Sequence, residues 1–230
     1  MRFTFSAFAI AAAALGAAQT FSNPSSIAVP ASGTSGPATP SSIAVSGITD
    51  PVVSVTVDLL GLTHTFPDDL DILLVNPSGQ GAIIMSDAGS SFDIDGVDLS
   101  FDDSSANVLP DAAILTSGTY MPANYGGSDV WTATTPAPPA GPYGTTLSSL
   151  LSGNVNGNWW LFIEDDAAAD VGVFAGGWRL NFTTQPVPDG NTRIENGNNK
   201  RGPFWPPLIV SLTVFSYHGR RCHPFASPKY

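Results

Sequence analysis

The chain has few bases, few histidines and almost no cysteine, and each shortage excludes a class of protein. Of 230 residues, 12% are charged, and 8 Lys and Arg face 19 Asp and Glu, for a net charge of −11. Nucleic-acid binders need a surplus of Lys and Arg, and coiled coils need many charged side chains, so both classes are excluded. The single cysteine, Cys222, allows no intramolecular disulfide. The fold must therefore rest on its core or on a metal.

Amphipathic helices are also missing, because no segment longer than about ten residues after the N-terminal region repeats its apolar side chains with a helical period. Instead, 23 Gly and 20 Pro separate short apolar runs. These runs predict strands at 25–29, 41–45, 52–62, 70–75, 82–85, 97–101, 159–163 and 177–182. Residues 117–146 form a long Gly/Pro/Thr-rich loop. The sequence predicts an all-β antiparallel sandwich over about 22–184.

The N-terminal residues indicate export. Met1-Arg2 is followed by an apolar, alanine-rich run from Phe3 to Leu15 and by the small residues Gly16-Ala17-Ala18. A positive charge, a short apolar region and small residues at the end are typical of a secretory signal peptide. The run is shorter than the roughly 20 residues that span a bilayer, so no transmembrane span is expected. We predict a signal peptide over 1–18 that is removed, and a secreted or cell-surface protein.

Charge divides the rest of the chain in two. Residues 21–184 hold 17 acidic side chains, 16 of them Asp, against the single base Arg179, while the last 46 residues carry a net charge of +4. We therefore treat 185–230 as a separate, irregular tail. Its order of Pro186-Val187-Pro188, an apolar stretch at 204–217 and Arg220-Arg221 resembles a degenerate bacterial PEP-CTERM sorting signal. A disordered tail and an out-of-frame end are the alternatives.

Three motifs carry a family resemblance. Residues 62–79 combine a histidine at 64 with an Asp-Leu-Asp-Ile strand and an Asn-Pro-Ser-Gly turn, 157–165 form a Gly-Asn-Trp strand that ends on Asp, and 176–180 contain Trp-Arg-Leu. Together they resemble the P domain (P/Homo B domain) of kexin- and furin-type proprotein convertases, in its bacterial form. The resemblance implies an eight-stranded jelly-roll β-sandwich of the galactose-binding-like type. It also implies a link to proteolysis by subtilisin-type serine endopeptidases.

The resemblance does not extend to catalysis. In convertases the catalytic triad lies upstream of this domain, whereas here the resemblance begins soon after the expected cleavage site. A serine nucleophile needs a base, and His64 is the only histidine before the tail. We expect His64 to be a hydrogen-bonded structural residue. The first functional hypothesis is therefore a secreted, non-catalytic module that binds or stabilises an extracellular subtilisin-like protease.

Calcium is the cofactor that the residues favour. Ca²⁺ takes six to eight oxygen ligands, largely carboxylates and carbonyls. Asp is clustered at 68–71, 87, 93–98, 102–103 and 165–170, and one arginine cannot neutralise these groups. Asp69, Asp71 and Asp165 are the candidate ligands, because they flank strand ends in the three motifs. The competing interpretation is that Asp is a good turn residue that keeps a secreted protein soluble.

The tryptophans suggest a second function. Trp159 and Trp178 match core positions of the resembling family, and a strand tryptophan usually packs in the core. Trp160, at the next position, faces the other side of its strand and is the candidate ligand-binding residue. Many jelly rolls bind sugars by stacking on such rings. The alternative hypothesis is therefore a calcium-dependent glycan-binding module whose partner is a cell-surface glycan.

Overall fold

The structure is a computed structural model that describes residues 17–29 and 35–185. The predicted tail falls outside these residues except for Gln185, and the predicted signal peptide except for Ala17 and Ala18. Strand β1 begins at Ala18, four residues before the predicted start of the sandwich. Its side chains alternate between exposed and half-buried, and it lies at the edge of a sheet, beside β12. Removal of residues 1–18 would leave five of the six β1 residues in place.

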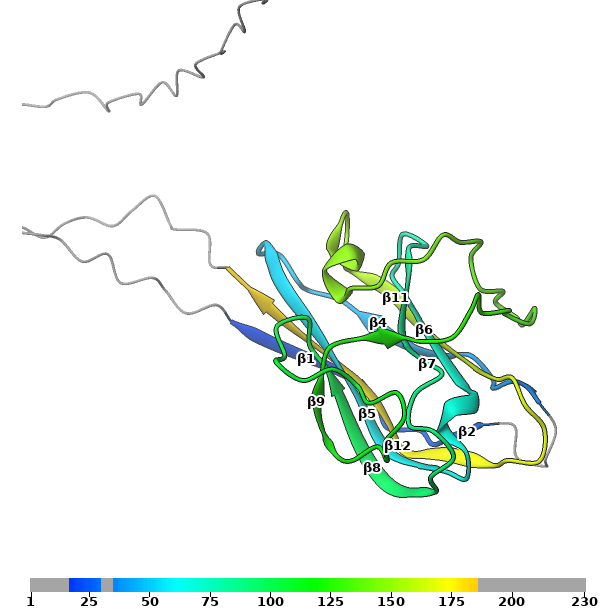
Figure 1. The fold of residues 1–230 in the computed structure, drawn as a ribbon. Helices are drawn as coiled ribbons and strands as arrows, with labels where there is room; N and C mark the ends of the chain where they lie inside the picture. Colours follow the sequence, from blue (N-terminus) through cyan, green and yellow to red (C-terminus); the bar gives the residue numbers. More distant parts are fainter. Residues whose placement is uncertain (1–16, 30–34, 186–230) are drawn as a thin grey trace, which may run out of the picture. The chain divides into compact units, whose positions relative to one another are not determined.

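The described residues form twelve strands and two short 3₁₀ helices, and the strands make two sheets that pack against each other (Figure 1). The first sheet contains β1 (Ala18–Asn23), β2 (Ile27–Val29), β5 (Val52–His64), β8 (Ile94–Phe101), β9 (Gly118–Tyr120) and β12 (Gly172–Thr184). The second contains β3 (Gly36–Pro37), β4 (Ser41–Val45), β6 (Leu70–Val75), β7 (Gly81–Ser86), β10 (Ala123–Asn124) and β11 (Gly157–Asp165). The helices are η1 (Pro67–Asp69) and η2 (Leu147–Leu151).

The order of the strands is that of a jelly roll. β1 and β2 share one edge of β12, and β3 and β4 share one edge of β11, so each pair occupies one position. The first sheet then runs β1/β2, β12, β5, β8 and the second β3/β4, β11, β6, β7, all antiparallel. These eight positions form two interleaved Greek keys, which confirms the predicted eight-stranded sandwich. β9 and β10 are short parallel additions that the sequence analysis treated as loop.

The main core lies between the two sheets. Val55, Val57 and Leu59 alternate with more exposed residues along β5 and point inward, as their period of two predicts. Trp159 and Trp178 are fully buried, which confirms their predicted core positions. The Trp159 indole N–H donates to the Val155 carbonyl at 2.9 Å, and the Trp178 N–H to Ser41 Oγ at 2.9 Å. Among the described residues there is no helix long and apolar enough to cross a membrane.

A second, smaller core covers the outer face of the second sheet. Leu73, Val75, Ile83 and Phe162 are buried there. Residues 125–144, which we call the covering loop, contribute Trp131 and Tyr143 to this cluster. β6 is consequently buried on both faces, which explains why its sequence is a continuous apolar run. The loop is therefore part of the fold, and its path decides what lies over the sheet.

The core assignment predicts a strong contrast between two aromatic truncations. Trp178→Ala should lower the free energy of unfolding by about 3–5 kcal/mol, because it empties the space of a fully buried ring. Phe92→Ala should change it by less than about 0.5 kcal/mol, because Phe92 is 47% exposed. Urea denaturation of both variants measures the difference. Similar losses in the two variants would contradict the assignment.

Candidate metal centre

Carboxylates gather at one end of the second sheet. β6 begins where β7 and β11 end, because neighbouring strands are antiparallel and Leu70 pairs with Asp165 while Ile72 pairs with Met85. The turns and loops at this end are acidic. They bring together Asp68, Asp69, Asp71, Asp87, Asp129, Glu164, Asp165, Asp166 and Asp170. Arg179, the only Lys or Arg among the described residues, is exposed on β12 in the other sheet.

Three of these carboxylates converge. Asp71 lies on the outer face of β6, Asp87 follows the end of β7, and Asp129 belongs to the covering loop. One oxygen of each lies within 4.8 Å of the others. We call Asp71, Asp87 and Asp129 the acidic triad. It joins three segments that are distant in the sequence.

The triad has too few hydrogen-bond donors for its charge. Ser86 Oγ lies 2.9 Å from Oδ2 of Asp87 and 2.9 Å from Oδ1 of Asp129, and it is also the donor that lowers the pKa of Asp71. One hydroxyl has one proton, so it serves one carboxylate at a time. The Asn124 amide adds a bond of 3.2 Å to Asp129. Asp71 is only 4% exposed, while the two short contacts of this hydroxyl go to Asp87 and Asp129.

The pKa values reflect this deficit. Burial, together with the charges of Asp129 and Asp87 and against the effect of Ser86, raises the pKa of Asp71 from 3.8 to about 7. Burial likewise raises the pKa of Asp87, with contributions from Asp166 and Asp129. Without a cation, the triad therefore tends to retain protons near neutral pH.

The donor set fits a hard divalent cation. The triad contains carboxylate oxygens and no histidine or cysteine, which favours Ca²⁺ or Mg²⁺ over Zn²⁺. Ca²⁺ binds oxygens at about 2.4 Å, so ligands on opposite sides of the ion lie up to about 4.8 Å apart. The three oxygens satisfy that limit. Because Ca²⁺ accepts irregular coordination and water ligands, it suits a site built from a strand, a strand end and a loop.

The structure separates the three predicted ligands. Asp71 is in the triad, whereas Asp165 points inward and Asp69 lies in η1. Burial raises the pKa of Asp69 to about 7, followed by the charges of Asp166, Asp170, Asp165 and Asp68. Asp69 is thus close to Asp165, and its carbonyl accepts a 3.0 Å bond from the Asp166 N–H.

Sequence reasoning missed Asp129 altogether. Asp87 belonged to the acidic groups that the sequence analysis noted, and its place directly after a predicted strand is a signal for a site at that sheet edge. Asp129 offered no comparable signal, because it lies in a Gly- and Pro-rich loop. The path of such a loop is set by what it packs against and not by its own pattern.

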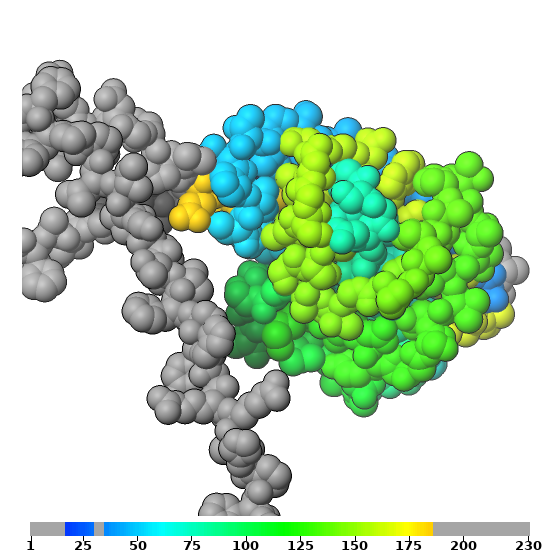
Figure 2. Space-filling model, turned by 90° about the horizontal axis from the view of Figure 1, so that it is seen from above, coloured from blue at the N-terminus to red at the C-terminus, as the bar shows by residue number. Residues whose placement is uncertain are grey.

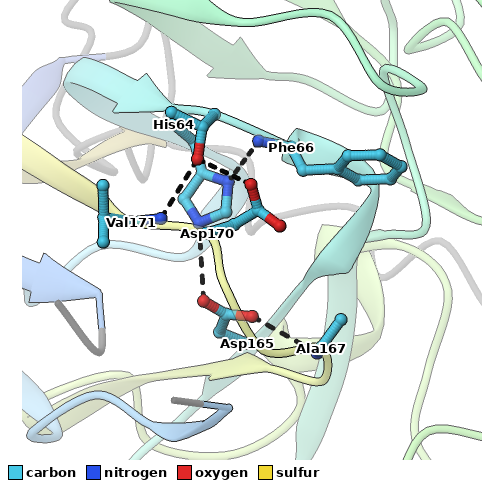
Figure 3. A network of polar contacts seen from close by, with 7 residues as sticks. His64, Phe66, Asp165, Ala167, Asp170 and Val171 are labelled. Atoms are coloured by element: carbon cyan, nitrogen blue, oxygen red, sulfur yellow. Dashed lines mark hydrogen bonds and ion pairs between the residues drawn. The ribbon is translucent and has the colours of Figure 1, made fainter. Parts of the chain in front are cut away.

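Asp165 instead forms a buried contact with His64 between the two sheets (Figure 3). His64 Nε2 lies 3.6 Å from Asp165 Oδ2, and both side chains are fully buried. His64 Nδ1 accepts a 3.1 Å hydrogen bond from the Phe66 N–H, which places the ring proton on Nε2, facing the carboxylate. Asp165 Oδ1 accepts from the Ala167 N–H at 3.3 Å. The expected hydrogen bonding of His64 is confirmed.

This contact also leaves His64 no position from which to activate a nucleophile. Both ring nitrogens face protein groups, and the ring has no exposed surface. Gly172 lies against the ring so closely that a Cβ there would collide with it. Burial raises the pKa of Asp165, while the neighbouring His64 lowers it.

Trp160 occupies the outer face of the second sheet. It pairs with Val75 of β6 and packs, half-buried, against the smaller core, on the opposite side from Trp159. This orientation agrees with the expected alternation along β11.

No family model, curated protein or solved structure matches the chain. The resemblance to P domains therefore rests on the three sequence motifs.

The His64–Asp165 contact predicts different effects for two substitutions. Asp165→Asn preserves the shape and removes a buried charge, so it should change the free energy of unfolding by less than about 1 kcal/mol at pH 7.5. Asp165→Ala leaves the His64 N–H without its neighbour, so it should lower the free energy of unfolding by about 1–3 kcal/mol. Urea denaturation distinguishes the two variants, and equal losses would show that the contact does not hold the sheets together.

Proposed function

We propose that the chain is a secreted, non-catalytic β-sandwich module that binds Ca²⁺ at Asp71, Asp87 and Asp129 and has a binding or stabilising role. The observation that carries this proposal is the convergence of three carboxylates, one of them buried, at a place where two of them share the single Ser86 hydroxyl. The partner that we propose, on the basis of the P-domain-like motifs, is an extracellular subtilisin-type serine endopeptidase.

Calcium would act on the covering loop. The ion supplies the positive charge that the triad lacks, and it would link Asp129 of the loop to Asp71 and Asp87 of the sheet. The loop is attached nearby by Thr132, whose N–H and Oγ1 donate to Glu164 at 3.1 and 2.8 Å. At its far end, Gly144 exchanges backbone bonds of 2.8 and 3.1 Å with Gly81 and Ile83. The ion would therefore fix the first part of a loop whose last part is already held by β7.

A calcium titration tests the triad. At pH 7.5, Ca²⁺ at about 100 times its Kd should raise the Tm of the secreted protein by about 5–11 °C relative to EGTA, from about 2.7 kcal/mol of binding free energy. Asp71→Asn and Asp129→Asn should abolish the increase. Asp71→Asn should also keep or raise the Tm in EGTA, because it removes a buried charge. Differential scanning calorimetry measures each transition.

The controls separate the triad from the ligands predicted by sequence. Asp165→Asn and the exposed Asp93→Asn should both retain the calcium response, as Asp69→Asn should. An unchanged Tm on calcium addition to the unsubstituted protein, or a response lost in Asp165→Asn and kept in Asp71→Asn, would refute the triad as the site.

The pH dependence has a defined sign. Asp71 has a pKa of about 7 in the folded protein and about 4 when unfolded, so the unfolded state loses its proton first as the pH rises. In EGTA, stability should therefore fall between about pH 4 and pH 7. Calcium binds the ionised form, so its stabilising effect should be larger at pH 7.5 than at pH 5. A calcium effect that shrinks as the pH rises would contradict this assignment.

The proposed partner and the lack of catalysis can be tested together. The tagged protein should co-purify a subtilisin-like protease from the native culture medium when Ca²⁺ is present, and the purified chain should leave casein intact. Serine-inhibitor-sensitive cleavage of casein by the purified chain would overturn the non-catalytic assignment. Recovery of no protease would overturn the proposed partner.

A further inference from the structure

A groove of about 520 Å³ lies on the outer face of the second sheet. Trp160 and Phe162 of β11 line it together with Pro77 of the turn after β6, and Pro136 and Pro139 of the covering loop contribute a wall. Figure 2 looks onto a face where β11 (yellow-green) and the turquoise segment near residue 80 lie beside the green of the covering loop. Its volume lies within the range of small-ligand pockets, roughly 300–1,000 Å³.

None of the residues that line the groove is charged, although the domain around it carries a net charge of −16. Phosphates and carboxylates would meet repulsion from the surrounding Asp residues and find no base in the groove. Cationic ligands would find no carboxylate there. The lining therefore favours a neutral ligand.

The polar groups of the groove point to a polyhydroxyl ligand. The amides of Asn76 and Asn156 are occupied, because they hold the turns at Gln80 and Ile48 in place. Asn158 is exposed two residues before Trp160, on the same face of β11, and its amide makes no hydrogen bond within the described residues. An amide that both donates and accepts therefore lies beside an indole ring.

We propose that this groove binds a neutral glycan of one or two sugar rings. The C–H face of a sugar ring would stack on Trp160, and its hydroxyl groups would bond to the Asn158 amide. Proline-rich peptides also bind grooves lined by several aromatic rings. Here Phe162 is only 4% exposed, so Trp160 is the aromatic platform of the groove, and the neighbouring amide favours hydroxyl groups.

The wall formed by Pro136 and Pro139 connects the groove to the acidic triad. The same loop carries Asp129 of the triad and Thr132, which bonds to Glu164, a few residues earlier. A cation at the triad would fix the loop and thus the wall. Glycan binding should therefore depend on Ca²⁺, a part of the inference that rests on the proposed function.

The test measures retention of the full secreted chain on immobilised neutral oligosaccharides, with 2 mM Ca²⁺ or with EGTA. Immobilised sialylated glycans and a proline-rich peptide serve as comparison ligands. We expect Ca²⁺-dependent retention on at least one neutral glycan and a loss of affinity of about tenfold or more in Trp160→Ala. Asn158→Ala should bind more weakly. Phe92→Ala is the matched control for an exposed aromatic and should bind unchanged.

Two further variants separate folding and calcium effects from loss of the groove. Trp160→Phe keeps an aromatic ring against the smaller core and should retain partial binding. If Trp160→Ala folds but does not bind, the loss of binding is then due to the missing ring. Trp160→Ala should keep the calcium-dependent rise in Tm, whereas Asp71→Asn should lose both that rise and calcium-dependent retention. If no neutral glycan is retained, if only the peptide is retained, or if Trp160→Ala binds normally, the glycan groove is wrong. Equal retention in Ca²⁺ and EGTA would refute its dependence on the triad.

Discussion

Three carboxylates converge where β6, β7 and the covering loop meet, and two of them share the single Ser86 hydroxyl. The arrangement of the outer face depends on how this negative charge is balanced. Asp71 is buried there because the loop lies over the sheet, and the loop lies over the sheet because Leu73, Ile83 and Phe162 would otherwise be exposed. Hydrophobic burial therefore brings Asp129 to Asp71 against their electrostatic repulsion. A cation removes that opposition, since it converts the carboxylates from repelling neighbours into ligands of one ion.

The alternation of side chains along β11 gives its two faces different chemistry. Glu164 and Asp165 are neighbours in sequence, yet Glu164 holds Thr132 of the covering loop while Asp165 contacts His64 inside the sandwich. Trp159 and Trp160 divide in the same way, one into the main core and the other beside the groove. A pair of adjacent residues thus contributes to two sites that lie on opposite sides of one sheet.

Much of the fold follows from local patterns in the sequence. The period-two run of β5, the apolar run of β6 and the Asn-Pro-Ser-Gly turn each predict their elements, because a strand's burial pattern and a turn's backbone are set by nearby residues. β9 and β10 could not be found in this way. They hold two or three pairs each and exist because the neighbouring strand offers an open edge. The triad escaped prediction for a related reason, since Asp129 reaches it through tertiary contacts of the loop, among them the packing of Trp131 and Tyr143 and the bonds from Thr132 to Glu164.

The sequence also grouped Asp71 with Asp165, and the register explains why strand-end position alone is an insufficient guide. Asp71 pairs with Glu164, and Asp165 pairs with Leu70, so the two aspartates lie one position apart along the ladder and face opposite sides of the sheet. Asp165 faces the ring of His64 at 3.6 Å within the core and accepts a hydrogen bond from the Ala167 N–H, whereas Asp71 lies beside a Ser86 hydroxyl that contacts Asp87 and Asp129. The distinction between a structural carboxylate and a proposed cation ligand therefore rests on available donors. At this end of the second sheet, the carboxylates on the outer face have fewer hydrogen-bond donors than they can accept from.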